Sequence, residues 1–277
     1  GADAVLVRSA AMHGMELPKS LLAVARAGAG VNNIPLADCA EQGIVVFNTP
    51  GANANGVKEL VLAGMLLASR DIAGGIEWVK SDKEDGDIAK TAEKQKKKFA
   101  GCEISGKKLG IIGLGAIGLW TARMAKGFGM KVIANSRHKK TGPQYDGIEQ
   151  VSMEEIFERS DVISIHCPHT KETENLLNRE AFAKMKDGVI IINTARGIII
   201  DEEALLEALE SRKVYMAGLD VVANEPPQYQ IPLMQSPYTF ITSHIAWQPK
   251  AARLRAVDLA VKNFRSYLEG MPTSVIN

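Results

Sequence analysis

Three polar side chains stand at the ends of apolar segments in the second half of the chain. Arg196 lies in INTARG, Glu225 in DVVANEPP and His244 in ITSHIAW. An arginine can bind a carboxylate through two parallel hydrogen bonds, and a histidine can donate or accept a proton near neutral pH. A glutamate beside the histidine would stabilise the charged ring and fix its orientation. The three residue types therefore suit acid–base chemistry on a small carboxylic acid.

A glycine-rich turn earlier in the chain predicts a dinucleotide site. The sequence GLGAIG follows the apolar run KKLGII directly and precedes a predicted helix over residues 116–128. Glycines permit a tight turn, close approach of a pyrophosphate and packing of helix on strand, while the helix N-terminus offers free N–H groups and partial positive charge. We expect this turn to bind a nicotinamide dinucleotide through Gly113, Gly115, Ala116, Ile117 and Gly118.

The segment after the next predicted strand bears on which dinucleotide binds. It reads ANSRHKK over residues 134–140, where an NAD enzyme usually carries a carboxylate for the ribose 2′-hydroxyl. A hydroxyl and several cationic or titratable groups stand there instead, which suits a 2′-phosphate. Ser136, Arg137 and His138 therefore favour NADP(H). The alternative is a solvated basic turn that leaves the protein indifferent between NADP(H) and NAD(H).

The elements that must position these residues alternate between apolar runs and helical patterns. Such alternation predicts an α/β fold, with a doubly wound parallel-sheet (Rossmann) nucleotide domain and a smaller flavodoxin-like substrate domain. Strand-like runs occupy residues 4–9, 21–30 and 43–50, before a long helix over about 57–70. A second series comprises LGIIGLG, MKVIANS, DVISIHCP, GVIIINTARG, MAGLDVV and FITSHIAW. Ligands bind beyond the carboxyl ends of strands in such a sheet, so the three polar residues should converge there.

The length of 277 residues favours two domains. We expect a substrate domain over residues 1–100, completed by a C-terminal helix over 250–277, and a nucleotide domain over 101–249. The polar, lysine-rich stretch 81–101 predicts an exposed helix between the domains. Lys96, Lys97 and Lys98 within it are more easily explained as a solvated face than as a phosphate contact across a dimer interface.

Composition excludes several classes of protein. Lys plus Arg (33) nearly cancels Asp plus Glu (32), so we expect neither nucleic acid nor an anionic membrane as a partner. Cys39, Cys102 and Cys167 are far apart and form no metal-binding pattern, so we expect packing cysteines, no metal and no disulfide framework. The chain shows no membrane span and no signal pattern, which favours the cytoplasm.

Taken singly, each of the three polar residues has a structural explanation. Arg196 could form a surface ion pair, Glu225 could cap a helix near Pro226, and His244 could be a hydrogen-bonded core residue. For Glu225 alone the structural explanation is the stronger. Together, at three strand ends and behind a dinucleotide fingerprint, the catalytic interpretation is the better one.

These blocks resemble the D-isomer-specific 2-hydroxyacid dehydrogenases. GLGAIG, HCPHTKET, INTARG, LDVVANEPP and SHIAW match family blocks in order, over nearly the whole chain. The resemblance implies hydride transfer at C2 of a 2-hydroxy or 2-keto acid, with Arg196, Glu225 and His244 as the catalytic set. It implies a homodimer with residues 57–70 and 96–106 near the partner. Further cofactor contacts that it implies are Cys167, Pro168, Thr173, Thr194, Ala195, Asp220 and Ala246, besides Arg196 and His244.

Two subfamilies meet in this sequence. The first hundred residues, with LVRSA and RAGAGVNNIP, resemble the substrate domain of 3-phosphoglycerate dehydrogenases, which implies substrate contacts at Arg8, Ala29, Gly30, Val31 and Asn53, besides Arg196 and His244. The nucleotide half, with ANSRHKK and SHIAWQPKAAR, resembles glycerate dehydrogenases that reduce hydroxypyruvate. We expect 3-phosphoglycerate as substrate, with hydroxypyruvate or glyoxylate as the alternative. Arg8 could instead be an ordinary salt-bridge partner.

Two further expectations concern the ends of the chain and its class of activity. The chain begins almost inside a strand, so the smaller domain could lack its first strand and helix, and no C-terminal regulatory domain is expected. The alternative to an enzyme is a protein that binds NAD(H) to sense it. Substitution of His244 would abolish turnover in the enzyme and change nothing of consequence in the sensor.

Overall fold

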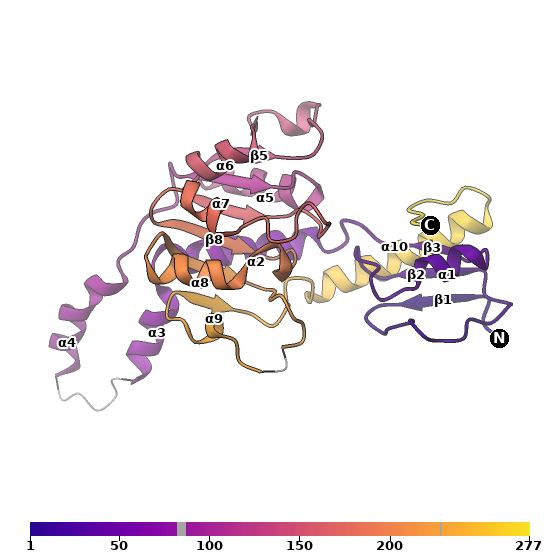
Figure 1. Cartoon of the computed structure of the whole chain (residues 1–277), viewed down its shortest axis with the longest axis horizontal. Coiled ribbons are helices and arrows are strands. Elements are labelled where there is room, and N and C mark those ends of the chain that lie inside the picture. Colours follow the sequence, from indigo (N-terminus) through magenta and orange to yellow (C-terminus); the bar gives the residue numbers. More distant parts are fainter. Residues whose placement is uncertain (82–86, 228) are drawn as a thin grey trace. The chain divides into compact units, whose positions relative to one another are not determined.

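Figure 1 shows the computed structural model, which describes residues 1–81, 87–227 and 229–277. The described residues divide into two compact units, one of Gly1–Gly56 with Ala246–Asn277 and the other of Val57–Ile245. Within those residues, the helices are all too short or too polar to cross a lipid bilayer. The α/β fold class expected from the alternating pattern is confirmed.

The smaller unit, which is described throughout, contains a three-stranded parallel sheet. Its order is β1 (Ala4–Val7), β2 (Ala23–Arg26) and β3 (Val45–Phe47). α1 (Leu36–Glu41) packs against β3, and the long C-terminal helix α10 (Lys250–Leu268) packs against β2. The last residue closes the β3 edge, because the Asn277 side chain accepts a hydrogen bond from the Val46 N–H and donates one to the Ile44 carbonyl, both at 2.8 Å.

In the described part of the chain, the larger unit contains a seven-stranded parallel sheet in the order β10-β9-β8-β7-β4-β5-β6. The strands are β4 (Lys108–Ile112), β5 (Lys131–Asn135), β6 (Glu149–Gln150), β7 (Val162–Ile165), β8 (Val189–Asn193), β9 (Val214–Leu219) and β10 (Thr239–Ile241). The order reverses at β4, because the chain runs from β4 outward to β5 and β6 and then returns to β7. Such a switch point is where an open α/β sheet leaves room for a ligand beyond the strand ends.

Helices cover both faces of this sheet. α5 (Ala116–Gly127) leads from β4 toward β5, whereas α6 (Met153–Arg159), α7 (Arg179–Lys184) and α8 (Glu202–Glu210) lead in the opposite direction. Right-handed crossovers therefore place α5 on one face and the other three on the opposite face, where Figure 1 shows them together. α2 (Ala54–Ser69) lies on the α5 side, with Lys58 over the Trp120 ring. It begins three residues before the predicted start at Val57.

The lysine-rich stretch forms α4 (Ile88–Gln95) and a 3-10 turn, η1 (Lys96–Phe99), which packs beside α3 (Ile72–Ser81). None of the residues described in these three elements is buried, so the solvated-face interpretation of the lysines agrees with the structure. The described residues of this stretch belong to the larger unit. The part of the prediction that covers residues 82–86 lies outside the described residues.

The remaining short elements are η2 (Pro143–Tyr145), η3 (Gly197–Ile199) and α9 (Pro232–Gln235). η3 follows the strand end that carries Arg196. The sequence does not predict strand β6, because two residues are too few to show an alternation of apolar and polar side chains.

Candidate active site

Arg196, Glu225 and His244 occupy the loops that follow β8, β9 and β10. These three strands are neighbours in the sheet, and all run in the same direction. The three side chains therefore leave one edge of the sheet side by side, although 48 positions separate Arg196 from His244 in the sequence numbering. The structure thus brings together the residues that the sequence placed at strand ends.

Glu225 and His244 are in direct contact. The Nδ1 of His244 lies 2.7 Å from Oε2 of Glu225, and the other carboxylate oxygen accepts a hydrogen bond from the Val222 N–H at 3.0 Å. Two contacts on two oxygens fix the plane of the carboxylate and, through it, the imidazole ring. The His244 and Glu225 side chains are 37% and 31% exposed, so the far nitrogen of the ring can meet a ligand.

The charge of Glu225 depends on its neighbours. Burial raises the pKa of the Glu225 carboxyl, but the hydrogen bond and charge of His244, the Val222 N–H and the charge of Arg196 together bring that pKa below its usual value. Glu225 is therefore ionised near neutral pH and can stabilise an imidazolium. The same effect shows that the positive charge of Arg196 reaches Glu225.

A buried carboxylate, that of Asp220, holds the loop that carries His244. Asp220, only 2% exposed, accepts hydrogen bonds from the Thr242 hydroxyl at 2.5 Å and from the Ile245 N–H at 2.8 Å. Between these anchors His244 adopts φ +53°, a left-handed conformation that costs free energy in a residue with a side chain. Its backbone is thus held in a strained geometry that presents the ring beside Glu225.

Two residues that sequence reasoning missed position Arg196. The fully buried Asn193 side chain accepts a hydrogen bond from the Ala195 N–H at 3.0 Å and donates one to the Arg196 carbonyl at 2.9 Å. At Gly197, a Cβ atom would lie 1.9 Å from the carbonyl carbon of Val222. Only glycine therefore lets the β8 loop approach the loop that carries Glu225. The final glycine of INTARG was a signal for this approach.

The three glycines of the fingerprint have different roles. A Cβ at Gly113, where φ is +101°, would lie 2.5 Å from the Cys167 nitrogen, and one at Gly118 would lie 2.2 Å from the Gly113 oxygen. The fold itself requires these two glycines. A Cβ at Gly115 would meet nothing within 4 Å, so the protein leaves space there that its own packing does not use.

That space lies at the start of α5, where Gly115 is the N-cap residue and offers no side chain to the first N–H groups of the helix. Ala116 is exposed and Ile117 half-buried at the same end. Free N–H groups, a helix dipole and an open cradle fit a pyrophosphate. The residues present therefore fit a dinucleotide.

Polar atoms at the ends of β7 and β8 fit a ligand as well. His166 Nδ1 and Thr194 Oγ1 are buried and have no hydrogen-bond partner within the described residues, and they follow neighbouring strands. Burial lowers the pKa of His166 to about 4 and raises that of Cys167 to about 11, so both side chains are neutral at pH 7. Ala195 is half-buried on the same edge and Pro168 is exposed. Orphaned polar atoms of this kind are usually completed by a ligand or water.

The basic turn after β5 and the loop after β7 approach each other. Ser136 donates to the His138 carbonyl at 2.8 Å, so its hydroxyl is engaged within the turn. Arg137 lies 3.9 Å from Glu172, and both side chains are more than two-thirds exposed. The Thr173 hydroxyl accepts a hydrogen bond from the Thr170 N–H and donates one to the Pro168 carbonyl, each at 2.8 Å. These two hydrogen bonds hold the loop after β7.

The predicted substrate residues other than Arg196 and His244 belong to the smaller unit. The Arg8 guanidinium stacks 3.4 Å from the centre of the Trp247 ring. Burial and then the positive charge of Arg253 lower the pKa of Arg8. Neither arginine forms an ion pair with a carboxylate in the part of the chain that the structure describes.

The other residues expected to contact substrate or cofactor in that unit are Ala29, Gly30, Val31, Asn53 and Ala246. Ala29 is exposed and its carbonyl accepts from the Asn48 side chain at 2.8 Å, whereas Gly30, Val31 and Asn53 are half-buried. Ala246 is buried, and its carbonyl lies where a Cβ at Gly56 would come within 2.9 Å.

The three cysteines are free in the structure, but they do not share one environment. Cys39 is buried and Cys167 half-buried, whereas Cys102 is exposed, so the prediction that all three are packing residues is wrong for Cys102. No group of His, Cys, Asp and Glu residues suited to a metal occurs within residues 1–81, 87–227 and 229–277.

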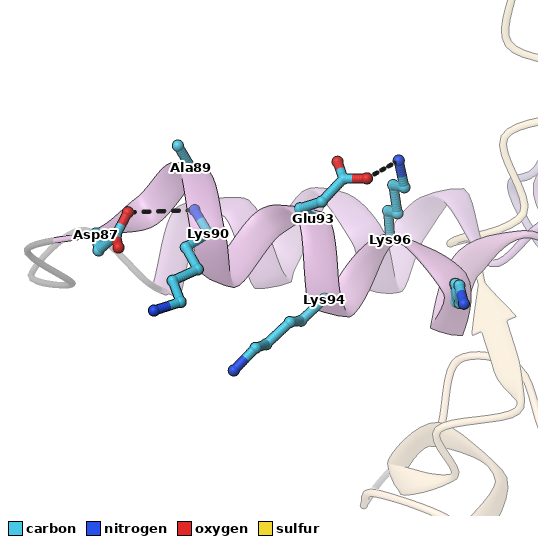
Figure 2. Close-up of a pocket in the computed structure, with 7 residues that line it drawn as sticks. Asp87, Ala89, Lys90, Glu93, Lys94 and Lys96 are labelled. Carbon is cyan, nitrogen blue, oxygen red and sulfur yellow. Dashed lines mark hydrogen bonds and ion pairs between the residues drawn. The ribbon is translucent and has the colours of Figure 1, made fainter.

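An open hollow of about 850 Å³ lies on α4 and η1, away from the strand ends. Figure 2 shows that its lysines project from the helix surface, with Asp87 accepting from the Lys90 N–H and Glu93 pairing with Lys96. It is a solvated, charged surface. We assign no part of the active site to it.

Comparison with known proteins places this geometry in a family. Residues 62–246 match the D-isomer specific 2-hydroxyacid dehydrogenase, NAD binding domain, family. The chain belongs to this family. It is 43% identical over 270 residues to a hydroxypyruvate reductase of Thermotoga maritima, covering 95% of this chain and 84% of that protein. It is 37% identical to a D-3-phosphoglycerate dehydrogenase of Archaeoglobus fulgidus, covering 98% of this chain and half of that protein.

The fold comparison agrees. A glyoxylate reductase from Paecilomyes thermophila superposes with a TM-score of 0.83 at 36% identity, covering 94% of this chain and 76% of that one. The chain is thus an NAD(P)-dependent oxidoreductase that acts on the CH–OH group of a 2-hydroxy acid.

Proposed function

We propose that His244 is the proton donor and acceptor at the 2-oxygen, that Glu225 is its charge partner, and that Arg196 binds the substrate carboxylate and polarises the 2-oxygen. The observation that carries this proposal is the 2.7 Å contact between His244 and Glu225 at the strand edge that Arg196 shares. Glu225 stabilises the imidazolium, so the ring carries a proton when the substrate binds for reduction. The ring gives this proton to the developing alkoxide during reduction and takes it back during oxidation.

A nicotinamide dinucleotide, when bound, accepts or supplies the hydride. Gly113, Gly115 and the N-terminus of α5 would hold its pyrophosphate, as the free N–H groups and the open space at Gly115 suggest. The orphaned atoms of His166 and Thr194 would meet polar groups of the same ligand. Cys167, Pro168 and Ala195 would line the pocket from the same strand ends.

We propose 3-phosphohydroxypyruvate and 3-phosphoglycerate as the physiological acids. Arg8 and Arg253 are close enough for their charges to interact, and neither has a carboxylate partner among the described residues. Two uncompensated guanidinium groups are costly without an anion and suit a phosphate dianion. Trp247 covers one face of the Arg8 guanidinium and leaves its edge for hydrogen bonds.

Hydroxypyruvate is the second candidate acid, with glyoxylate beside it. The 43% identity to a hydroxypyruvate reductase favours it, as does the structural likeness to a glyoxylate reductase. The two candidates differ at C3, where only the phosphorylated acid needs paired cations.

We further propose that NADP(H) is the preferred cofactor, with Arg137 as the 2′-phosphate contact and Ser136 and His138 shaping the turn. The Arg137 guanidinium is the strongest hydrogen-bond donor to an anion in that turn. Its only ion-pair partner among the described residues is the exposed Glu172, at 3.9 Å. NAD(H) is the alternative.

We also propose that the protein acts as a homodimer, with residues 1–100 and 250–277 selecting the acid and residues 101–249 binding the cofactor.

The test is a matrix of initial rates, with NADH and NADPH each combined with 3-phosphohydroxypyruvate, hydroxypyruvate and glyoxylate. We expect the phosphorylated acid to have the highest kcat/KM, and Arg8→Gln to raise its KM much more than that of hydroxypyruvate. Equal effects on both acids would contradict the phosphate assignment. His244→Gln should abolish turnover yet still bind NADPH, whereas His169→Gln, at an exposed histidine outside the catalytic set, should change neither.

A further inference from the structure

Two loops face each other across the end of β4. Strands β5 and β7 flank β4 in the sheet, so the turn after β5 and the loop after β7 lie on either side of the glycine-rich turn. The ion pair between Arg137 and Glu172 joins these two loops. Any nucleotide whose pyrophosphate lies at Gly115 and whose adenosine ribose lies beyond β5 must meet this pair.

The turn that carries Arg137 is fixed at its base. The Asn135 side chain donates to the Val151 carbonyl at 2.8 Å, and the Gln150 side chain makes reciprocal 2.7 Å hydrogen bonds with the N–H and carbonyl of Lys140. The tip between these anchors projects an exposed guanidinium, that of Arg137. Arg137 can therefore change partner without unfolding of the turn.

The loop that carries Glu172 is fixed by the Thr173 contacts described above, so the position of Glu172 is set by its own loop and not by Arg137. A hydrogen bond from the Thr170 side chain, and more weakly the charge of Arg137, lower the pKa of Glu172. An ionised carboxylate, on a loop that is held by its own hydrogen bonds, thus lies beside the guanidinium that we assign to the 2′-phosphate.

We infer that Glu172 is a cofactor-specificity residue, whose carboxylate occupies Arg137 in the absence of nucleotide and competes with a 2′-phosphate for it. This inference rests on the proposed role of Arg137. The carboxylate disfavours NADP(H) in two ways, because the phosphate must displace it and must then lie near its negative charge. NAD(H) carries no charge at that position and meets neither penalty. Glu172 therefore sets how far the basic turn can favour NADP(H).

The test measures binding without catalysis. Dissociation constants for NADPH, NADH and 2′,5′-ADP are determined by calorimetry or fluorescence for the unmodified protein, Glu172→Gln, Arg137→Gln and the control Glu174→Gln. Glu174 lies in the same loop and pairs with His169 instead of Arg137. Because exposed ion pairs are weak, Glu172→Gln should tighten NADPH and 2′,5′-ADP roughly two- to fivefold and leave NADH nearly unchanged. Added salt should erase the gain.

The outcomes separate the inference from the function on which it rests. If Arg137→Gln weakens 2′,5′-ADP but Glu172→Gln leaves the NADPH-to-NADH ratio unchanged, the inference is wrong and the role of Arg137 stands. If Glu172→Gln weakens NADH instead, the carboxylate accepts from a ribose hydroxyl, and competition is refuted. If Arg137→Gln leaves 2′,5′-ADP binding unchanged, the proposed NADP(H) contact fails, and the inference fails with it.

Discussion

The substitution Glu225→Gln tests the catalytic arrangement most directly, because it keeps the shape of the side chain and removes its charge. In the structure one oxygen of Glu225 accepts from Val222 and the other contacts His244 at 2.7 Å. A glutamine can keep one of these contacts, but it cannot stabilise an imidazolium electrostatically. A hydrogen bond to a charged group contributes about 1.5–3 kcal/mol.

Loss of that contribution in the protonated form corresponds to a fall of roughly 10- to 150-fold in the rate of ketone reduction at pH 7. The assay is kcat/KM for reduction from pH 5 to 9, together with the dissociation constant of the reduced cofactor, which should stay within about twofold if only the acid–base step is affected.

Glu202 provides a matched control. Its carboxylate accepts a hydrogen bond from the Ala223 N–H at 2.7 Å, in the same loop as Val222, and it makes no contact with His244. Glu202→Gln should leave the rate within about twofold of the unmodified protein. A Glu225→Gln enzyme with a normal rate of reduction would refute the assigned role of Glu225, as would an equal loss in Glu202→Gln.

The lowered pKa of Glu225 means that its contribution to stability is present above the unfolded-state value of about 4.3 and is lost as pH falls through the folded-state value, so the difference in unfolding free energy between the unmodified protein and Glu225→Gln should shrink in acid; a difference that grows in acid would contradict it. Gly113→Ala should lower the melting temperature, because its Cβ would lie 2.5 Å from a backbone nitrogen, whereas Gly115→Ala should keep the melting temperature and weaken cofactor binding; equal melting temperatures would show that Gly113 is not required by the fold. Cys167, with a pKa of about 11, should react with iodoacetamide at pH 8 far more slowly than the exposed Cys102, and comparable rates by mass spectrometry would show that the Cys167 thiol is not shielded.

Local pattern was enough to predict the parallel sheet and the residues at its edge. Apolar runs separated by helices require a doubly wound sheet, and such a sheet brings its carboxyl strand ends to one edge. From that rule alone, Arg196, Glu225 and His244 were expected to converge, and the structure brings Glu225 and His244 into contact with the charge of Arg196 nearby. The GLGAIG turn was equally readable, because its glycines directly follow a strand and directly precede a helix.

Only the tertiary structure decided what holds these residues in place. Asn193 and Gly197 look like ordinary loop residues in the sequence, and their roles appear only when the β8 loop meets the β9 loop. The stacking of Arg8 on Trp247 joins positions 239 apart in the numbering, and the pair of Arg137 with Glu172 joins two loops on either side of β4. Sequence periodicity reports which face of an element is buried, whereas contacts between loops depend on strand order and on space between backbones, which no local pattern records.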